Sequence, residues 1–195
     1  MKHDPVVHSA SYLTPEGFGN NRKGAQPWRA EDGASETPMD PSRVAWSSLF
    51  SSSCPRFGRM DLLSRLGLMA VELLGVEFAA MSEEDRDEVG GALMIPSGSL
   101  STDIDFLKEI SPSTFIYTLP SSVIGEICIR HRLRGPVLCL TSDAVSGRSI
   151  VDEAAERIRL GEARSMLCLA CEARSPEASR VLDFSLDKQR SFCWD

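Results

Sequence analysis

The sequence predicts an α/β domain with a mixed, mostly parallel sheet covered by helices on both faces. Two observations support this class. Apolar runs typical of buried strands, at residues 89–95 and 137–141, alternate with amphipathic helical stripes at residues 61–76, 121–131 and 146–160. Strands separated by helices need crossover connections, and such connections join parallel strands within one sheet.

The N-terminal part of the chain differs in composition from the rest. Residues 5–13 form a candidate first strand that ends at the turn signal Thr14-Pro15-Glu16-Gly17. Residues 15–55 are rich in Gly, Pro and Ser and hold no period of 2 or 3.6, which predicts loop. We therefore divide the single expected domain into residues 1–55, the first strand with this loop region, and the core at residues 56–195.

The core begins with a helix and a strand. Asp61 is placed to cap a helix whose apolar stripe comprises Leu62, Leu66, Met69, Leu73 and Val76. The acidic residues 83–88 indicate a solvated loop, and residues 89–95 read as a buried strand that ends at the turn-forming residues 96–99.

Two helices are predicted next. The first covers residues 102–109 and is followed by a turn at Ser111-Pro112. The second is capped by Ser121 or Ser122, and its Glu126 and Arg130 have the spacing of an intrahelical ion pair. Gly135-Pro136 ends this helix.

The last elements surround a strand-to-helix turn. Residues 137–141 are expected to form a strand in the middle of the sheet, and a helix over residues 146–160 ends at Gly161. Residues 164–172 and 180–186 then predict a final antiparallel pair of strands. A turn of this kind places a residue at a helix N-terminus, where free N–H groups stabilise a thiolate or an oxyanion.

Composition and charge exclude several function classes. The 195-residue chain carries a net charge of −7 with an isoelectric point near 5.1, which argues against a nucleic-acid partner. No apolar run is long enough to span a membrane, and the N-terminus lacks a signal-peptide core, so we expect a cytoplasmic protein. No dinucleotide fingerprint, phosphate loop or zincin motif occurs, and no cofactor is expected.

The six cysteines do not predict a disulfide framework or a metal centre. Most lie in apolar runs, as small buried hydrophobic residues do in reducing compartments. Cys168 and Cys171 have knuckle spacing, but no second pair and no nearby histidine completes a zinc site. On a strand, residues three apart face opposite sides, so we interpret both as buried thiols without a metal.

Several local motifs together resemble a known enzyme family. They are Arg56-Phe57-Gly58-Arg59-Met60-Asp61, Ser111-Pro112, Arg134-Gly135-Pro136, Ser146-Gly147, Ile158-Arg159-Leu160-Gly161-Glu162 and the strand-ending Glu172. Their order over residues 6–186 resembles the N-terminal half of a β-ketoacyl-acyl-carrier-protein synthase, an enzyme of the thiolase-like fold. The chain is most similar to short stand-alone synthase-like proteins encoded beside aryl-polyene, other polyene or polyketide genes.

The resemblance implies that the catalytic machinery is degenerate. It aligns the family's nucleophilic cysteine with Ala144, and Cys139 is no substitute because it lies in mid-strand. Ser142 and Ser146 are weak candidate nucleophiles, since a serine needs a base within hydrogen-bond reach; a strand-end hydroxyl and a helix cap are their simpler interpretations.

The bases are missing as well. The family's two catalytic histidines come from a C-terminal half that the 195 residues do not include. His131 is interpreted as a core or half-buried side chain, because it lies on the apolar side of its predicted helix. We therefore expect no condensation by this chain alone.

Three functions remain open. The first is a degenerate synthase-like subunit that acts with an intact ketosynthase or an acyl carrier protein in fatty-acid, polyketide or aryl-polyene assembly, by analogy with chain-length factors. The second is an acyltransferase or 3-oxoacyl synthase activity completed by a partner or by a serine near the turn. The third is a structural homodimer unrelated to acyl chains. Five residues of one strand are the candidate interface: Val137, Leu138, Cys139, Leu140 and Thr141.

Overall fold

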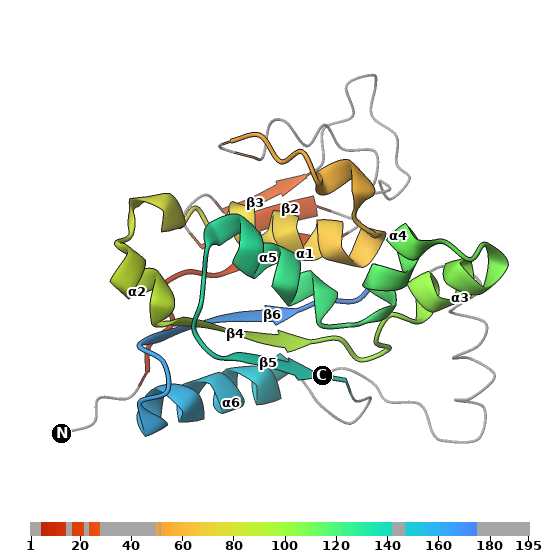
Figure 1. Cartoon of the computed structure of the whole chain (residues 1–195). Coiled ribbons are helices and arrows are strands. Elements are labelled where there is room, and N and C mark those ends of the chain that lie inside the picture. The colour runs from red at the N-terminus through yellow and green to blue at the C-terminus, as the bar shows by residue number, and fades with distance from the viewer. Residues whose placement is uncertain are drawn as a thin grey trace, which may run out of the picture.

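The computed structural model describes residues 5–14, 17–21, 24–27, 50, 52–141 and 147–174. A parallel three-stranded sheet forms the centre, in the order β5 (Val137–Leu140), β4 (Val89–Met94), β6 (Ser165–Ala170). Figure 1 shows this sheet with α1 (Leu62–Leu73) and α5 (Ser122–His131) above it and α6 (Gly147–Leu160) below it. The predicted α/β class with helices on both faces is confirmed.

The central strand is saturated with hydrogen bonds on both sides. Gly91 N donates to Pro136 O on one side of β4, at 2.9 Å, and Met94 O accepts from Cys171 N on the other, also at 2.9 Å. All six residues of β4 are buried, which explains why the strand reads as a continuous apolar run instead of an alternation. The expectation that residues 137–141 lie in the middle of the sheet is wrong, because β5 is an edge strand of the described sheet.

Two apolar clusters hold the layers together. The larger lies between the sheet and the α1/α5 layer, and it includes Leu68, Leu93, Ile124 and Ile127. The smaller lies between the sheet and α6, where Ala92, Met94, Ile150 and Ala154 pack together. Gly67 lets α1 approach closely, since a Cβ there would lie 2.6 Å from Val123 Cγ1.

The helix boundaries lie close to the predicted ones, but the cap expected from Ser121 or Ser122 at the start of α5 is absent: the Ser121 side chain makes no capping hydrogen bond, and Ser122 Oγ donates to Ile116 O. Asp61 caps α1, as predicted, by accepting a hydrogen bond from Ser64 N at 2.9 Å. The remaining helices before α5 are α2 (Glu83–Asp87), α3 (Leu100–Lys108) and α4 (Pro112–Phe115), with 3₁₀ turns at η3 (Phe57–Arg59), η4 (Phe78–Ala80) and η5 (Ile116–Thr118). The acidic loop expected at residues 83–88 is instead α2, because Ser82 caps Asp85 N at 3.0 Å.

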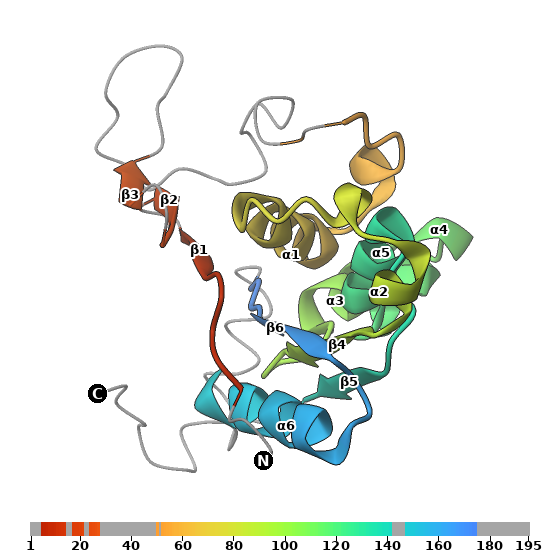
Figure 2. The same ribbon diagram turned by 90° about the vertical axis from the view of Figure 1, so that its left-hand side faces the viewer.

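The N-terminal region contains more structure than its composition predicts. A separate antiparallel sheet joins β1 (Ser11–Thr14), β2 (Gly17–Asn20) and β3 (Gly24–Pro27), although loop was expected from residue 15 onward. The first strand expected at residues 5–13 is only β1, since residues 5–10 form no strand. Figure 2 shows this sheet beside α1 and away from the central sheet. Asn20 Nδ2 donates to Leu73 O at 2.7 Å, so the small sheet satisfies carbonyls at the end of α1.

Other expectations fall partly outside the described residues. The first strand of the predicted final pair is β6, but residues 180–186 lie outside the described part of the chain. The division between residues 1–55 and 56–195 stays a prediction. Among the helices of the described ranges, none is long and apolar enough to cross a membrane.

Candidate functional site

The candidate site lies at the C-terminal ends of the three parallel strands of the central sheet. Because β4, β5 and β6 run in the same direction, the residues that follow them lie at the same end of the sheet. Ligands bind at this end of the strands in open α/β sheets. Thr141 follows β5 and is exposed, and α6 begins at Gly147. The predicted strand-to-helix order is therefore present. Ser142, Ala144 and Ser146 lie outside the described residues.

Glu172 ties two of the strand ends together. Its carboxylate accepts hydrogen bonds from Ser97 Oγ and from Ser97 N, the latter at 3.3 Å, while Arg174 Nε donates to it at 3.1 Å. Ser101 Oγ also donates to Ala173 O at 3.0 Å. The carboxylate of Glu172 therefore connects the residues that follow β4 with those that follow β6, and it positions these two segments relative to each other.

The start of α1 is attached to the same end of the sheet. Asp61 uses one carboxylate oxygen to cap α1 and the other to accept from Thr102 Oγ1 at 2.7 Å. Thr102 lies on α3, which follows β4 through the turn at Ser97. One side chain therefore fixes the start of α1 against the element that follows the central strand.

The two cysteines nearest the ends of β5 and β6, Cys139 and Cys171, are poor nucleophiles. Cys139 lies in mid-strand against the α1/α5 core, and burial raises the pKa of its thiol. Burial, with smaller contributions from Glu172 and Asp61, raises the pKa of Cys171 to about 12. A thiol that stays protonated at neutral pH cannot form a thioester readily.

Cys168, in β6, and Cys171, directly after it, face opposite sides of the sheet. Cys171 packs against the α1/α5 core, whereas Cys168 is exposed, so the expectation that both thiols are buried is wrong for Cys168. Within the described ranges, no group of three His, Cys, Asp or Glu side chains could hold a metal ion.

His131 lies at the other end of the sheet. It is the last residue of α5, which precedes the start of β5, whereas the candidate site follows the end of β5. Its ring packs on Phe78 with centroids 4.7 Å apart, and its Nε2 lies 3.6 Å from Glu72 Oε1. Burial lowers the pKa of His131, an effect that Glu72 opposes. His131 is therefore a mostly buried side chain at the end of the sheet where β5 begins, as the sequence analysis expected of a core or half-buried histidine.

The candidate interface strand has an open edge. Leu140 O accepts from Ile95 N at 3.0 Å and Pro136 O from Gly91 N, so alternate residues of β5 face β4. The backbone groups of Val137, Cys139 and Thr141 consequently point to the free edge. Leu138 and Leu140 pack toward α6, and Val137 is 52% exposed.

Two polar networks were not predicted from the sequence. Arg56 and Tyr117 donate to the buried Glu126 at 2.6 and 3.1 Å, and Arg130 pairs with the buried Glu72. The predicted ion pair between Glu126 and Arg130 is therefore wrong. The spacing of four residues predicted this intrahelical pair, but both side chains instead bind residues outside α5.

Comparisons with known proteins agree with this geometry. The model of the β-ketoacyl synthase N-terminal domain matches residues 25–184. The ishigamide ketosynthase/chain length factor is similar in structure with a TM-score of 0.58 at 25% identity, over 67% of this chain and 39% of that chain. No curated protein matches the chain in sequence.

A second solved structure supports the fold alone. It is a type II polyketide synthase acyl carrier protein in complex with its ketosynthase bound to the hexaketide, with a TM-score of 0.54 at 22% identity. The match covers 70% of this chain and 42% of that chain. The chain thus spans about two fifths of the length of each of these two proteins. By its sequence and its thiolase-like architecture, the chain belongs to the β-ketoacyl synthase family through the family's N-terminal domain.

Proposed function

We propose that this protein is a non-catalytic synthase-like subunit that acts with an intact ketosynthase or an acyl carrier protein in the cytoplasm. The observation that carries the proposal is the residue in the strand-to-helix turn: Ala144 lies in the sequence between β5 and α6, where the family resemblance places the nucleophile. An alanine methyl group forms no acyl-enzyme bond. Burial raises the pKa of Cys139 and of Cys171, and His131 lies at the opposite end of β5 from the residues that follow this strand.

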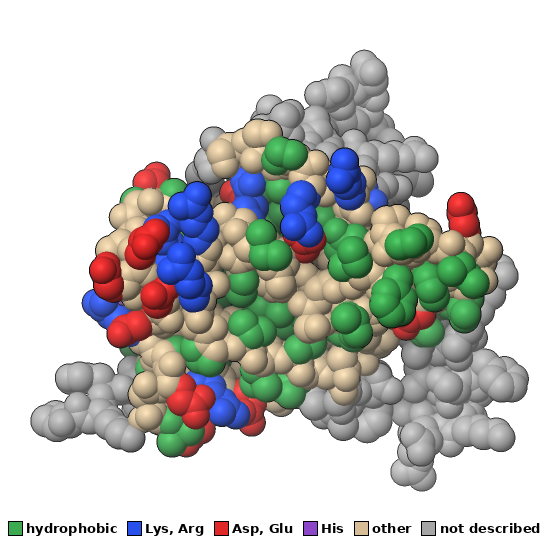
Figure 3. Space-filling view, in the orientation of Figure 1, with side chains coloured by type: hydrophobic (Ala, Val, Ile, Leu, Met, Phe, Trp, Pro, Cys, Tyr) green, Lys and Arg blue, Asp and Glu red, His purple; other side chains and the backbone are tan. Residues whose placement is uncertain are grey.

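An exposed apolar patch supports the need for a partner. Figure 3 shows hydrophobic side chains gathered over α3 and α4 at the right of the molecule. The patch comprises the exposed Leu107, Ile110, Phe115, Ile116 and Leu119. Contiguous apolar patches mark interaction sites in proteins of this size.

The open edge of β5 offers a second type of contact. Its outward-facing N–H and C=O groups can pair with a strand of another chain, and the exposed Val137 adds apolar area. The relatives include a ketosynthase/chain length factor and a ketosynthase in complex with its acyl carrier protein. We extend this type of assembly to the present chain and place its role in polyketide or aryl-polyene chain assembly.

The interface can be tested by affinity purification of the tagged chain from its native cell. We expect a ketosynthase subunit or a carrier protein to co-purify with the wild-type chain. The Val137→Lys/Thr141→Lys variant places two charges on the edge of β5, and its yield of partner should fall about tenfold, a difference of about 1.4 kcal/mol in binding.

Leu160→Lys is the matched control. Leu160 is 58% exposed at the end of α6, away from the edge of β5, so this variant should retain its partner. Recovery of neither a ketosynthase nor a carrier protein would contradict the subunit function. Equal recovery with the β5 variant and the wild type would exclude the β5 edge as the contact.

A further inference from the structure

One buried carboxylate lies between two basic side chains where α1 packs on α5. The Glu72 side chain is 7% exposed, and its Oε1 accepts a hydrogen bond from Arg130 Nε. The next residue, His131, is 13% exposed and places Nε2 at 3.6 Å from the same oxygen. Within the described part of the chain, this buried nitrogen has no hydrogen-bond partner. A proton on Nε2 would therefore complete a contact that the neutral ring leaves unmade.

Three elements surround the ring of His131. α1 contributes Glu72, α5 contributes Arg130, and η4 contributes the uncharged ring of Phe78 at a centroid distance of 4.7 Å. Burial has the largest effect and lowers the pKa of His131, which Glu72 raises and Arg130 lowers further. Among the described residues, these two are the charged groups that act on the ring. The ring is therefore neutral at neutral pH and takes up a proton only below its ordinary pKa of about 6.5.

Arg130 also holds the segment of the chain that precedes η3. Its guanidinium donates to the carbonyls of Ser53 and Ser52 at 3.3 and 3.2 Å and lies 4.9 Å from the ring centroid of Phe50. Ser52 and Ser53 are themselves exposed. The attachment of this segment to α5 thus depends on the orientation that Glu72 gives to Arg130.

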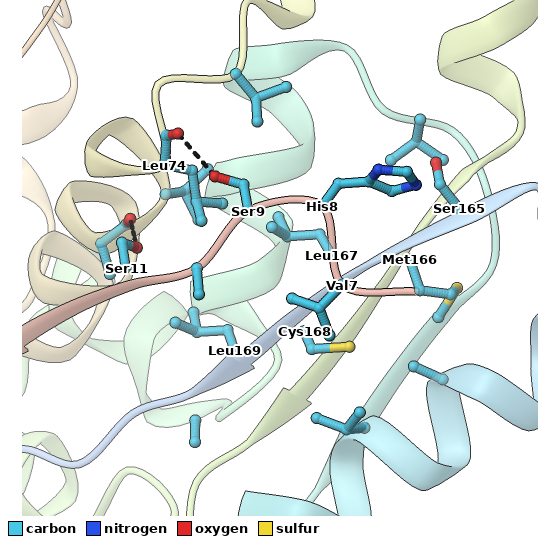
Figure 4. A pocket seen from close by; sticks show the side chains of 18 of the residues that line it. Val7, His8, Ser9, Ser11, Leu74, Ser165, Met166, Leu167, Cys168 and Leu169 are labelled. Atoms are coloured by element: carbon cyan, nitrogen blue, oxygen red, sulfur yellow. Dashed lines mark hydrogen bonds between the residues drawn. The ribbon is translucent and has the colours of Figure 1, made fainter. Parts of the chain in front are cut away.

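The end of α1 that carries Glu72 is fixed from its other side. Ser9 Oγ donates to Leu74 O at 3.0 Å, and Ser11 Oγ donates to Ala70 O at 2.6 Å (Figure 4). Both carbonyls belong to the same turn of α1 as Glu72, so these hydrogen bonds restrain the backbone that positions the carboxylate. A change of charge in the cluster must therefore be answered by its side chains.

We propose that these side chains form an acid-sensitive latch on the segment that precedes η3. When His131 is protonated, two positive charges share one carboxylate in a site with little water, and His131 takes over Glu72 from Arg130. Arg130 is the group that leaves, because its other partners are carbonyls of exposed residues. The Nε2 atom of His131, in contrast, is enclosed. The departure of Arg130 detaches Ser52 and Ser53 from α5.

The pKa of His131 sets the direction of this response. Because burial makes this pKa lower in the folded chain than in the unfolded one, the unfolded chain binds more protons as the pH falls. The contribution of the cluster to stability is therefore complete above about pH 6.5 and declines below that value. The latch is closed at neutral pH and opens in mild acid.

Nuclear magnetic resonance of the full ¹⁵N-labelled chain, from about pH 8 to about pH 5, tests the latch. The signals of the His131 ring, of Arg130 Nε–H and of the Ser52 and Ser53 amides are followed separately. We expect them to move together, with one midpoint below about pH 6.5. One pH unit below this midpoint, released chains should outnumber closed ones about tenfold. Circular dichroism should show unchanged helix over the same range.

Three variants separate the roles within the cluster. His131→Phe keeps an aromatic ring against Phe78 but takes up no proton, so the signals of Arg130 and of the two serines should no longer depend on pH. Glu72→Gln removes the carboxylate, and these signals should take their released positions already at neutral pH. His8→Phe is the matched control: His8 is exposed and lies beside β6 (Figure 4), so its removal should leave the response unchanged.

Three outcomes would overturn the latch. One is titration of His131 in the wild-type chain without any movement of the Arg130, Ser52 and Ser53 signals. Another is a pH response that persists in His131→Phe, which would assign it to a different group. The third is loss of helix over the same pH range, which would mean general acid unfolding. The first and third outcomes are measured on the wild-type chain, and none depends on a ketosynthase partner.

Discussion

Replacing Gly135 with alanine is expected to destabilise the fold by about 3 kcal/mol, because the new methyl group meets backbone atoms. A Cβ at Gly135 would lie 2.5 Å from both the carbonyl carbon and the oxygen of Val89 and 2.7 Å from Gly90 N. Gly135 N also donates to Val89 O at 3.1 Å, so the glycine fixes where β5 starts beside β4. Urea unfolding followed by circular dichroism measures the free energy of unfolding.

Gly125→Ala is the matched control for this experiment. Gly125 lies within α5, and a Cβ at this position would have no atom within 4 Å outside the backbone of its own helix. Alanine favours the helix by about 0.5–1 kcal/mol over glycine, so this variant should be slightly more stable than the wild type. If Gly135→Ala unfolds at the same urea concentration as the wild type, the close approach of β4 and the start of β5 is wrong.

Replacing Arg130 with methionine is expected to cost about 3 kcal/mol, because it leaves the buried carboxylate of Glu72 without its main partner. Arg130 pairs with Glu72 through Nε, and its guanidinium also donates to the carbonyls of Ser53 and Ser52 at 3.3 and 3.2 Å. The same group lies 4.9 Å from the ring centroid of Phe50. The loss should appear as a lower free energy of unfolding at neutral pH.

The double variant Glu72→Met/Arg130→Met separates the charge from the packing. Removing both partners leaves no unpaired charge, so most of the lost stability should return. Lowering the pH should also reduce the deficit of Arg130→Met, since Arg130 lowers the pKa of the neighbouring His131 and its removal favours the protonated ring beside Glu72. A double variant as unstable as the single one would show that packing of the arginine, and not its charge, supports the fold.

Patterns within one element predicted the core of the fold well. The sequence predicted three elements correctly, because each depends on neighbours within a few residues. They are the cap at Asp61, the buried strand at residues 89–94 and the helix that ends at His131. The sequence did not predict that β5 is an edge strand. A half-buried apolar strand has the same sequence pattern at an edge and in the middle, and only its pairing partners distinguish the two.

Long-range contacts explain the remaining differences. Glu126 and Arg130 have helical pair spacing, but Tyr117 with Arg56 and Glu72 with Ser52 bind them instead. The hydrogen bond from Ser97 to Glu172 joins residues far apart in the sequence. The spacing of residues within one helix or strand cannot predict such a contact. The interpretation of the turn between β5 and α6 as a former nucleophile site depends on the resemblance to the synthase family, since an alanine side chain carries no reactive group.

Intact mass spectrometry of the chain after incubation with acyl thioesters tests the non-catalytic function most directly. The purified protein is mixed with acyl-CoA and with an acyl-loaded carrier protein, and an intact ketosynthase serves as the positive control. Our account predicts that the mass of this chain stays unchanged and that no free thiol is released. A mass increase of one acyl group with release of the thiol, abolished by Ser142→Ala or Ser146→Ala, would contradict it.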